Sequence, residues 1–520
     1  MKRIYKYKAG KKEIVNEIDY IPVRYIIAMM ITVFEIIAVI SIVTILCYYV
    51  PYFYVLAWAT EVGCVIKIIA SDDNPDYKIP WLLFVLILPI AGFMLYLIFY
   101  SRKLQKKHVK RLERAKMRKI SVDDEKLFLR LKESDKQAYG QAKMLSDISD
   151  SHMFVNTEVK YFPLGENLFA SLIDDLKRAK RFIFMEYFII EEGELWDSVI
   201  EILKSKAKCG VDVRVLYDDI GCMRTLPGNY ARTLEKWGIR ATPFSRLKGQ
   251  LDSEFNNRNH RKITVIDGYI GYTGGVNVAD EYINRKKRFG HWKDVGVRIE
   301  GEAVWGLTEL FITDFEMNYK KSEEYPKELY PSCRCGQSGY VIPFGDGPRP
   351  IYLRNVSKCI IQSVLASATD YVYITTPYLI IDNELCASIE NTALRGVDVR
   401  IITPQIPDKK LVFSLTRSYY SRLIRAGVKI FEYTPGFIHA KIIISDNKYA
   451  VISTVNLDYR SLVHHFENGV WLYKCDCIDD IYSDINDTIE KCEEVRLEKL
   501  KVGIIARFVR SVARLFAPLL

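Results

Sequence analysis

The stretch HRKITVIDGYIGYTGGVN at residues 260–277 decides the fold, because the chain repeats it as HAKIIISDNKYAVISTVN at residues 439–456. Each copy reads His-x-Lys, four residues, Asp, and then an Asn ten residues after the Asp. One copy alone would be a weak signal, since a His-Lys pair on an edge strand also serves solubility. The matched pair predicts two half-sites that meet to form one site.

Strand geometry explains the spacing between the histidine and the lysine. A β-branched apolar run follows each His-x-Lys, ITVI after Lys262 and III after Lys441, and predicts a strand. Residues two apart on a strand share a face, so His260 should point the same way as Lys262, and His439 the same way as Lys441. A proton-transfer group then stands beside a positive charge that suits a phosphate.

The motif aspartates, Asp267 and Asp446, lie seven residues beyond their histidines, an odd offset that places them on the other face. They belong to the catalytic motif, but their Asp-Gly and Asp-Asn pairs are typical of hairpin turns, so their expected role is to fix the turn. With a two-residue loop, the returning strand would bring Gly274-Gly275 or Ser453-Thr454 beside the histidine. Small residues there would let an anion approach closely.

Two further pairs complete the expected site. Asn277 and Asn456 end the two copies, and their amide donors suit phosphate oxygens, as do the two motif lysines. Farther along, HWKDVGV and HFENGV each place a carboxylate in a strand-like stretch, Asp294 in the first half and Glu467 in the second. A catalytic histidine usually needs an orienting acid. We therefore expect Asp294 and Glu467 to orient the imidazoles, with Asn468 an equally close alignment for the second.

The repetition extends beyond the motifs and indicates the fold class. GVDVR occurs at residues 211–214 with its preceding Gly210 and again from Gly396, and helical stretches separate the apolar strands in both halves. Alternating strands and helices predict α/β units with a largely parallel sheet. We expect two tandem α/β/α domains related by a pseudo-twofold axis. Their predicted bounds are 151–325 and 348–495, with a linker at 326–347 and an insertion before His260 that could overhang the site.

Three apolar stretches, 25–49, 52–70 and 80–100, precede the domains and follow a basic segment at 1–24. Each is about 20 residues long, the length of a bilayer span, so residues 25–100 predict a membrane anchor of two or three helices. Lys and Arg next to the anchor place the catalytic domains in the cytoplasm. Three full spans would leave the basic N-terminus outside, a conflict that two spans avoid.

Charge distribution narrows the class of substrate. The chain has a net charge of +10, yet residues 102–119, within the predicted juxtamembrane linker 101–150, hold ten Lys or Arg against one Glu. The body of the chain, 120–495, is left mildly acidic. Basic segments next to a membrane attract anionic lipid headgroups. The acidic body lacks the basic stripe of a nucleic-acid binder, so we expect lipid and no nucleic acid.

The C-terminal segment 496–520 predicts a basic amphipathic helix. One face would carry apolar side chains and another would carry arginines; the apolar residues are Ile505, Phe508, Val509, Val512, Phe516 and Leu519, and the basic ones are Arg507, Arg510 and Arg514. We interpret it as an interfacial helix; the alternative is a helix whose apolar face packs on the domain. The eleven cysteines show no four-ligand zinc spacing, so no metal or cofactor is expected.

These residues resemble the phospholipase D superfamily, whose duplicated H-x-K-x4-D motif is followed by G-[G/S/T]-x-N; Ser453 departs from the usual Gly. Together with STVNLDYRSL and the apolar NPDYKIPWLLFVLILPIAGFMLYLIF segment, the likeness is to bacterial cardiolipin synthases over nearly the whole chain. The resemblance implies a phosphohistidine on His260, with His439 as acid and then base; the reverse assignment is the alternative. It implies phosphatidyl transfer between two phosphatidylglycerol molecules. A phospholipase D, a phosphatidylserine synthase, a nuclease and a non-catalytic scaffold are the alternatives.

Overall fold

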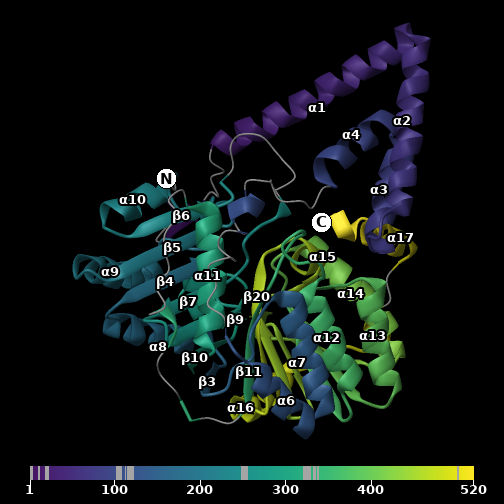
Figure 1. Ribbon diagram of the computed structural model, residues 1–520. Helices are drawn as coiled ribbons and strands as arrows, with labels where there is room; N and C mark the ends of the chain where they lie inside the picture. The colour runs from purple at the N-terminus through teal and green to yellow at the C-terminus, as the bar shows by residue number, and fades with distance from the viewer. Residues whose placement is uncertain are drawn as a thin grey trace.

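The computed structural model describes residues 4–9, 12–17, 23–100, 108–111, 113, 122–246, 256–319, 329–331, 335–336, 339–500 and 503–519. Two α/β domains lie side by side, and apolar N-terminal helices extend from one end of the second (Figure 1). The predicted fold class is therefore confirmed. Most of the basic run 102–119, the centre of the insertion before His260, and residues 326–328, 332–334 and 337–338 of the predicted linker lie outside the described residues.

The two sheets have the same strand order, which is the structural form of the repeat. The first runs β3-β10-β8-β7-β4-β5-β6 and the second β11-β20-β18-β17-β12-β14-β15-β21. The strands of the first are β3 (Thr157–Phe162), β4 (Phe182–Tyr187), β5 (Asp212–Asp218), β6 (Arg240–Phe244), β7 (Ile263–Ile266), β8 (Ile270–Gly274) and β10 (Gly296–Gly301). Those of the second are β11 (Tyr340–Asp346), β12 (Tyr371–Thr375), β14 (Asp398–Pro404), β15 (Lys429–Tyr433), β17 (Ile442–Ser445), β18 (Tyr449–Ser453), β20 (Glu467–Tyr473) and β21 (Cys492–Glu494).

Both sheets are mixed, and the prediction of a largely parallel sheet was wrong. Only β4, β5 and β6, and their counterparts β12, β14 and β15, pair in parallel. The motif itself forms a hairpin, β7 to β8 and β17 to β18, which makes the following part of each sheet antiparallel. Helix crossovers explain the parallel part, because a parallel connection needs a dozen or more residues.

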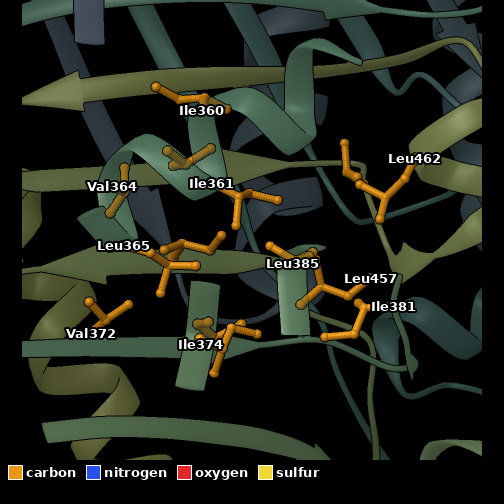
Figure 2. Packing of buried hydrophobic residues seen from close by; sticks show 14 of the residues in the cluster. Ile360, Ile361, Val364, Leu365, Val372, Ile374, Ile381, Leu385, Leu457 and Leu462 are labelled. Carbon is orange, nitrogen blue, oxygen red and sulfur yellow. The ribbon is translucent and has the colours of Figure 1, made fainter. Parts of the chain in front are cut away.

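Helices cover the sheets and close the core. In the first domain they are α8 (Gly165–Arg178), α9 (Glu194–Lys208), α10 (Tyr230–Lys236), η2 (Asp280–Ile283) and α11 (Val304–Asn318); in the second, α12 (Val356–Ser367), α13 (Asn383–Leu394), α14 (Lys410–Arg425), α15 (Tyr459–Val463) and α16 (Cys477–Ile489). Figure 2 shows the apolar side chains of α12 close to Val372 and Ile374 of β12. Helix α11 is buried on nearly every side and contacts strands of both sheets. A helix that is buried all round joins the two cores.

Two boundaries differ from the sequence prediction. Helices α6 (Glu125–Ser134) and α7 (Lys136–Ser149), in the stretch predicted as a juxtamembrane linker, pack on the second domain, where Leu131 and Leu145 are fully buried. Gln141 accepts the indole hydrogen bond of Trp471 at 3.0 Å. The second sheet also begins at Tyr340, inside the predicted linker. Helices α6 and α7 are stabilised by burying their apolar faces on the second domain, although the first domain follows them in sequence.

The N-terminal region holds a hairpin of β1 (Ile4–Ala9) and β2 (Lys12–Glu17), then α1 (Val23–Tyr49), α2 (Pro51–Ala70), α3 (Pro75–Ile87) and α4 (Pro89–Phe99). Among the described helices, two windows are long and apolar enough to cross a membrane, Met29–Leu46 and Tyr52–Ala70, and few of their residues are buried. The third apolar stretch, 80–100, breaks before Pro89, because proline lacks the amide hydrogen that a continuous helix needs. Helices α3 and α4 pack on each other across the break.

The C-terminal segment forms η4 (Leu497–Leu500), α17 (Ile504–Leu515) and η5 (Ala517–Leu519), and both α17 and η5 contact α3. Figure 1 shows α17, α3 and the C-terminus together beside α15. Short pairings outside the two sheets include β13 (Leu379–Ile380) with β19 (Leu457–Asp458), β9 (His291–Lys293) with β16 (Gly436–Ile438), and a bridge between Asn259 and Phe466. The last two join the domains.

Candidate active site

The two domains exchange backbone hydrogen bonds at the motif histidines. His260 donates its amide hydrogen to the carbonyl of Phe466 at 2.8 Å, and His439 donates to the carbonyl of Lys293 at 2.7 Å. Each histidine thus lies against the segment that carries the carboxylate of the other domain. The half-sites of the repeat are brought together, as the duplicated motif predicted.

Each imidazole is paired with the carboxylate of the opposite half. His260 Nδ1 lies 3.0 and 2.9 Å from the two carboxylate oxygens of Glu467, and His439 Nδ1 lies 2.6 Å from Oδ2 of Asp294. All four side chains are buried. The spacing along the sequence did not say which acid serves which histidine, because the crossing arises only when the domains dock. With Nδ1–H donated to the acid, Nε2 is left as the reactive nitrogen.

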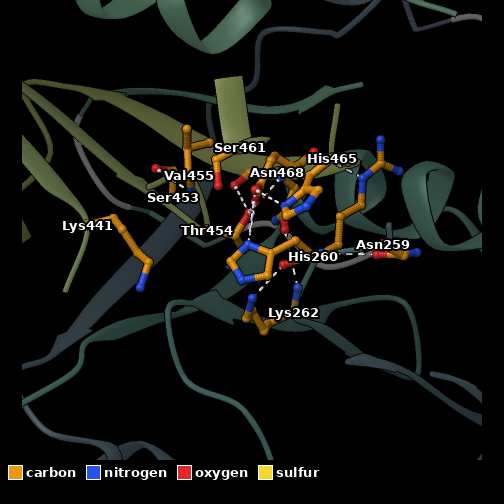
Figure 3. Close-up of polar contacts among 12 residues, drawn as sticks. Asn259, His260, Lys262, Lys441, Ser453, Thr454, Val455, Ser461, His465 and Asn468 are labelled. Carbon is orange, nitrogen blue, oxygen red and sulfur yellow. Dashed lines mark hydrogen bonds and ion pairs between the residues drawn. The ribbon is translucent and has the colours of Figure 1, made fainter. Parts of the chain in front are cut away.

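The motif lysines lie beside their histidines, as the two-residue spacing predicts. The Lys262 ammonium donates to the His260 carbonyl at 2.6 Å, and that of Lys441 donates to the His439 carbonyl. Lys441 Nζ also lies 2.8 Å from His439 Nδ1. We assign the Nδ1 proton to Asp294, the stronger acceptor at 2.6 Å. Figure 3 shows Lys262 next to His260 and Lys441 in the same view.

Burial determines the protonation of the site. It lowers the pKa of His260 to about 3 and that of His439 well below its usual range, so both imidazoles are neutral. Burial also lowers the pKa of Lys262 to about 7 and that of Lys441 to about 8. The nearby ammonium of Lys441 contributes to the lowered pKa of Lys262. An anionic phosphate would reverse these shifts by favouring the charged ammonium and imidazolium forms.

The two carboxyls differ. Burial raises the pKa of Asp294 to about 6. For Glu467, burial acts in the same direction, but the adjacent His260 outweighs it and holds the pKa below its usual range. The Thr454 hydroxyl also donates to Glu467, and His465 Nδ1 lies 3.6 Å from it. The His260 half-site is therefore the more polar of the two.

Asp267 and Asp446 lie in the turns and hold neighbouring loops. Asp267 accepts backbone hydrogen bonds from Lys180, Arg181 and Phe182 at 2.8, 2.6 and 3.0 Å. Asp446 accepts three equivalent bonds from residues 369–371, ahead of β12. Both side chains are thus taken up by the backbone ahead of a central strand, the structural role expected of them.

The motif turn is one residue longer than the two-residue loop predicted, so Gly274-Gly275 and Ser453-Thr454 have a different role from the one expected. Ile266 pairs with Ile270 and Ser445 with Tyr449, so each loop has three residues. A Cβ added at Gly275 would lie 2.0 Å from Oδ1 of Asp294. The anion that approaches this glycine is thus a carboxylate of the protein itself. In the other half Thr454 stands at the equivalent position and donates to Glu467.

The two asparagines are placed differently. Asn277 accepts from the amide of Ile189 at 3.0 Å and donates to the Tyr282 hydroxyl at 2.7 Å. Its expected role at the phosphate would therefore rest on its second amide hydrogen. Asn456 is buried, and within the described part of the chain its Oδ1 has no hydrogen-bond partner. The two halves have diverged around a common plan.

Sequence reasoning missed the support beneath the site. Arg261, between the motif histidine and lysine, is buried and donates to Asp314 at 2.9 Å and to the carbonyl of Glu467 at 3.0 Å. Asn259 donates to the same Asp314 at 3.1 Å. The sequence offered one signal: the x position of the motif is Arg261 in the first copy and Ala440 in the second. A charged residue at a buried strand position needs an ion-pair partner.

One cluster has the composition of a metal site. Ligand atoms of His260, His465 and Glu467 lie within 4.8 Å of one another. Glu467 is already the acceptor for His260 and Thr454, so the same atoms are explained by the hydrogen bonds that orient the imidazole.

Comparison with known proteins agrees with this geometry. A family model described as "Cardiolipin synthase, PLD-like domain" matches the chain twice, over residues 172–304 and 361–490. The chain belongs to the cardiolipin synthase family of phospholipase D-like proteins. A second model, "Phospholipase_D-nuclease N-terminal", matches residues 62–99, within the apolar helices.

Relatives cover almost the whole chain. A cardiolipin synthase of Halalkalibacterium halodurans is 33% identical over 90% of this chain and 94% of its own length. Cardiolipin synthase 2 of Bacillus anthracis is 35% identical over 88% of this chain and 89% of its own. Among solved structures, a phosphatidylserine synthase of Haemophilus influenzae matches 73% of this chain and 99% of its own, with a TM-score of 0.58 and 15% identity. That likeness shows the fold alone.

Proposed function

We propose that the protein is a phosphatidyltransferase that makes cardiolipin and glycerol from two molecules of phosphatidylglycerol. The observation that carries the proposal is the crossed pair of buried imidazoles, each with its own carboxylate, in a member of the cardiolipin synthase family. Two such pairs supply a nucleophile and an acid at one phosphodiester.

In the first step, His260 Nε2 attacks phosphorus and forms a phosphohistidine, while the P–O bond to glycerol breaks. Glu467 accepts the hydrogen bond from Nδ1 and stabilises the positive charge that develops on the imidazole. His439, protonated when the anionic lipid binds, gives its proton to the departing glycerol oxygen. Lys262 and Lys441 stabilise the charge on the phosphoryl oxygens, as would Asn277 and Asn456.

In the second step, His439 accepts the proton from the terminal glycerol hydroxyl of a second phosphatidylglycerol. That oxygen attacks phosphorus, the P–N bond to His260 breaks, and cardiolipin is released. His439 is thereby returned to its protonated form and His260 to its neutral form, so the cycle needs no metal or cofactor. Because two anionic lipids react in turn, a site with two lysines suits both charges.

The apolar helices support a membrane location. Two exposed apolar windows, Met29–Leu46 and Tyr52–Ala70, have the length of bilayer spans. We propose that α1 and α2 cross the cell membrane as a multi-pass anchor and that the catalytic domains face the cytoplasm. The basic N-terminal segment then lies on the same side as the domains, which agrees with the excess of positive charge inside.

The test is a product assay with purified full-length protein in vesicles of labelled phosphatidylglycerol. We expect cardiolipin and glycerol in equal amounts, with loss of both in His260→Ala and His439→Ala. His152→Gln, whose imidazole lies 3.6 Å from Asp124, serves as the control and retains activity. Phosphatidic acid without cardiolipin would instead identify a hydrolase, and phosphatidylserine on addition of serine would identify a different acceptor. Activity in the two histidine variants would reject the mechanism.

A further inference from the structure

We propose that helix α17 lies on the surface of an anionic bilayer with its apolar side chains in the lipid, and that it seats the second domain against the membrane. One face of α17 is unusually exposed: the exposed fractions are 81% for Ile505, 69% for Phe508 and 56% for Val509. Ile504 and Val512 are exposed as well. A contiguous apolar face on a surface helix marks an interaction site.

Two of the three arginines of α17 lie against the protein. Arg510 donates to the Ser414 hydroxyl at 3.0 Å, and the Arg514 guanidinium lies 4.2 Å from the centre of the Tyr419 ring, both on α14. An amphipathic helix that packs on its own domain buries the apolar face and exposes the charges. Here the orientation is the opposite, so the alternative of an ordinary packed helix does not account for α17.

The C-terminal end of α17 packs on α3, the helix that follows the proposed span α2 along the chain. The ring of Phe516, at the end of α17, lies 5.2 Å from the ring of Phe84 of α3 in a tilted arrangement, and η5 also contacts α3. An open hollow at this surface is lined by Ser414 of α14 and otherwise by the α17 segment itself, at Gly503, Ile504, Ile505, Val509 and Arg510. The outward face therefore lies close to the point where the proposed anchor α1–α2 ends and α3 begins.

Charge favours an anionic lipid as the occupant. Arg507 is exposed at the flank of the apolar face, where a headgroup phosphate would lie. The segment 496–520 carries six Lys or Arg and one Glu, whereas the body of the chain is mildly acidic. A basic residue near an anionic membrane surface contributes about 1 kcal/mol of attraction. The surface of an anionic bilayer would cover the apolar face with acyl chains and place headgroup phosphates beside Arg507.

This surface is connected through α3 to the segment that leads to Glu467. Asp76 of α3 accepts the amide hydrogen of Asn383 at 2.7 Å and the hydroxyl hydrogen of Tyr459 at 3.4 Å. Tyr77 lies 5.8 Å from the ring of His464, three residues before Glu467. Helix α3 thus joins α17 to the segment that carries the acid partner of His260. A membrane-seated α17 would hold that segment toward the lipid.

The experiment places the photoreactive residue p-benzoylphenylalanine at single positions of the full-length protein in phosphatidylglycerol vesicles. At Phe508 we expect adducts with lipid acyl chains; at Ala513, which packs partly buried against the second domain, we expect crosslinks within the chain. Repeating both in the His260→Ala background separates the result from the proposed function, since lipid contact does not need turnover. Crosslinks from Phe508 to a second copy of the chain, or to its own domain, would overturn the proposal.

A second measurement tests the charge. In Arg507→Gln the yield of lipid adducts at Phe508 should fall by about fivefold in phosphatidylglycerol vesicles, the loss expected for one basic contact. In phosphatidylcholine vesicles the variant and the parent protein should give the same yield. Equal yields of both proteins in phosphatidylglycerol would refute the preference for anionic lipid.

Discussion

Gly275→Ala should disable the His439 half-site through a single methyl group. The new Cβ would lie 2.0 Å from Oδ1 and 2.9 Å from Oδ2 of Asp294, whereas ordinary contacts begin at 3.4 Å. The buried carboxylate must therefore move by about 1 Å or more from a position where it lies 2.6 Å from His439 Nδ1. A displacement of about 1 Å costs on the order of 10²-fold in rate.

The assay is the rate of cardiolipin formation in vesicles, with Gly140→Ala as the matched control. Gly140 lies in α7 and nothing stands within 4 Å of its added Cβ, so that variant should keep full activity and gain a few tenths to about 1 kcal/mol of helix stability. In the Asp294→Asn background, Gly275→Ala should slow cardiolipin formation much less than it slows the parent enzyme. The carboxylate that the new methyl group displaces is already absent there. A Gly275→Ala enzyme within about threefold of the parent rate, or a full additional loss in the double variant, would refute the reasoning.

Three further predictions concern the same site. Glu467→Gln should slow phosphohistidine formation on His260 by about 10³- to 10⁴-fold, because the amide no longer holds the working tautomer; rapid-quench labelling checks this, and accumulation of the intermediate would contradict it. The profile of kcat/KM against pH should fall below about pH 6, as Asp294 gains a proton, and above about pH 7 to 8, as the motif lysines lose theirs. Lys441→Arg should extend the alkaline limb, because guanidinium keeps its charge; an unchanged limb would assign it elsewhere. Arg261→Met should lower the free energy of unfolding by about 3–5 kcal/mol in chemical denaturation, because it leaves the buried Asp314 carboxylate unpaired. The control Lys143→Met breaks an exposed pair and should cost less than about 1 kcal/mol. Equal losses in the two variants would argue against the importance of the Arg261–Asp314 pair.

The repeat made two features predictable from sequence: the strands of the motif and the placement of each motif histidine beside its lysine. Both features depend on local geometry. The side chains of His260 and Lys262 follow from a period of two, and the turn at Asp267 follows from the Asp-Gly pair. Which carboxylate serves which histidine depends on how the domains dock. That docking rests on contacts between segments about 200 residues apart, such as His260 with Phe466, and no local pattern encodes them.

Other errors came from reading neighbours in sequence as neighbours in space. Helices α6 and α7 precede the first domain but pack on the second, since their apolar face is covered by β11 and α12. The stretch 80–100 has the composition of a span, yet Pro89 and the close approach of Gly92 to Phe84 turn it back on itself. Hydropathy reports apolar area without showing which surface covers it.

The asymmetry of the half-sites bears on which histidine acts as nucleophile. His260 has an acid partner whose pKa is held low, with Thr454 and His465 beside it. His439 has an acid whose pKa is raised to about 6, and Trp292 lies 5.4 Å from its ring where the other half has His465. A permanently charged partner stabilises the imidazole that bears positive charge in a phosphohistidine, which favours His260. A weaker, more apolar partner leaves His439 readier to release its proton, as an acid must do when glycerol departs. In the proposed mechanism, the same duplicated plan would thus give the two histidines different roles through the residues that differ around them.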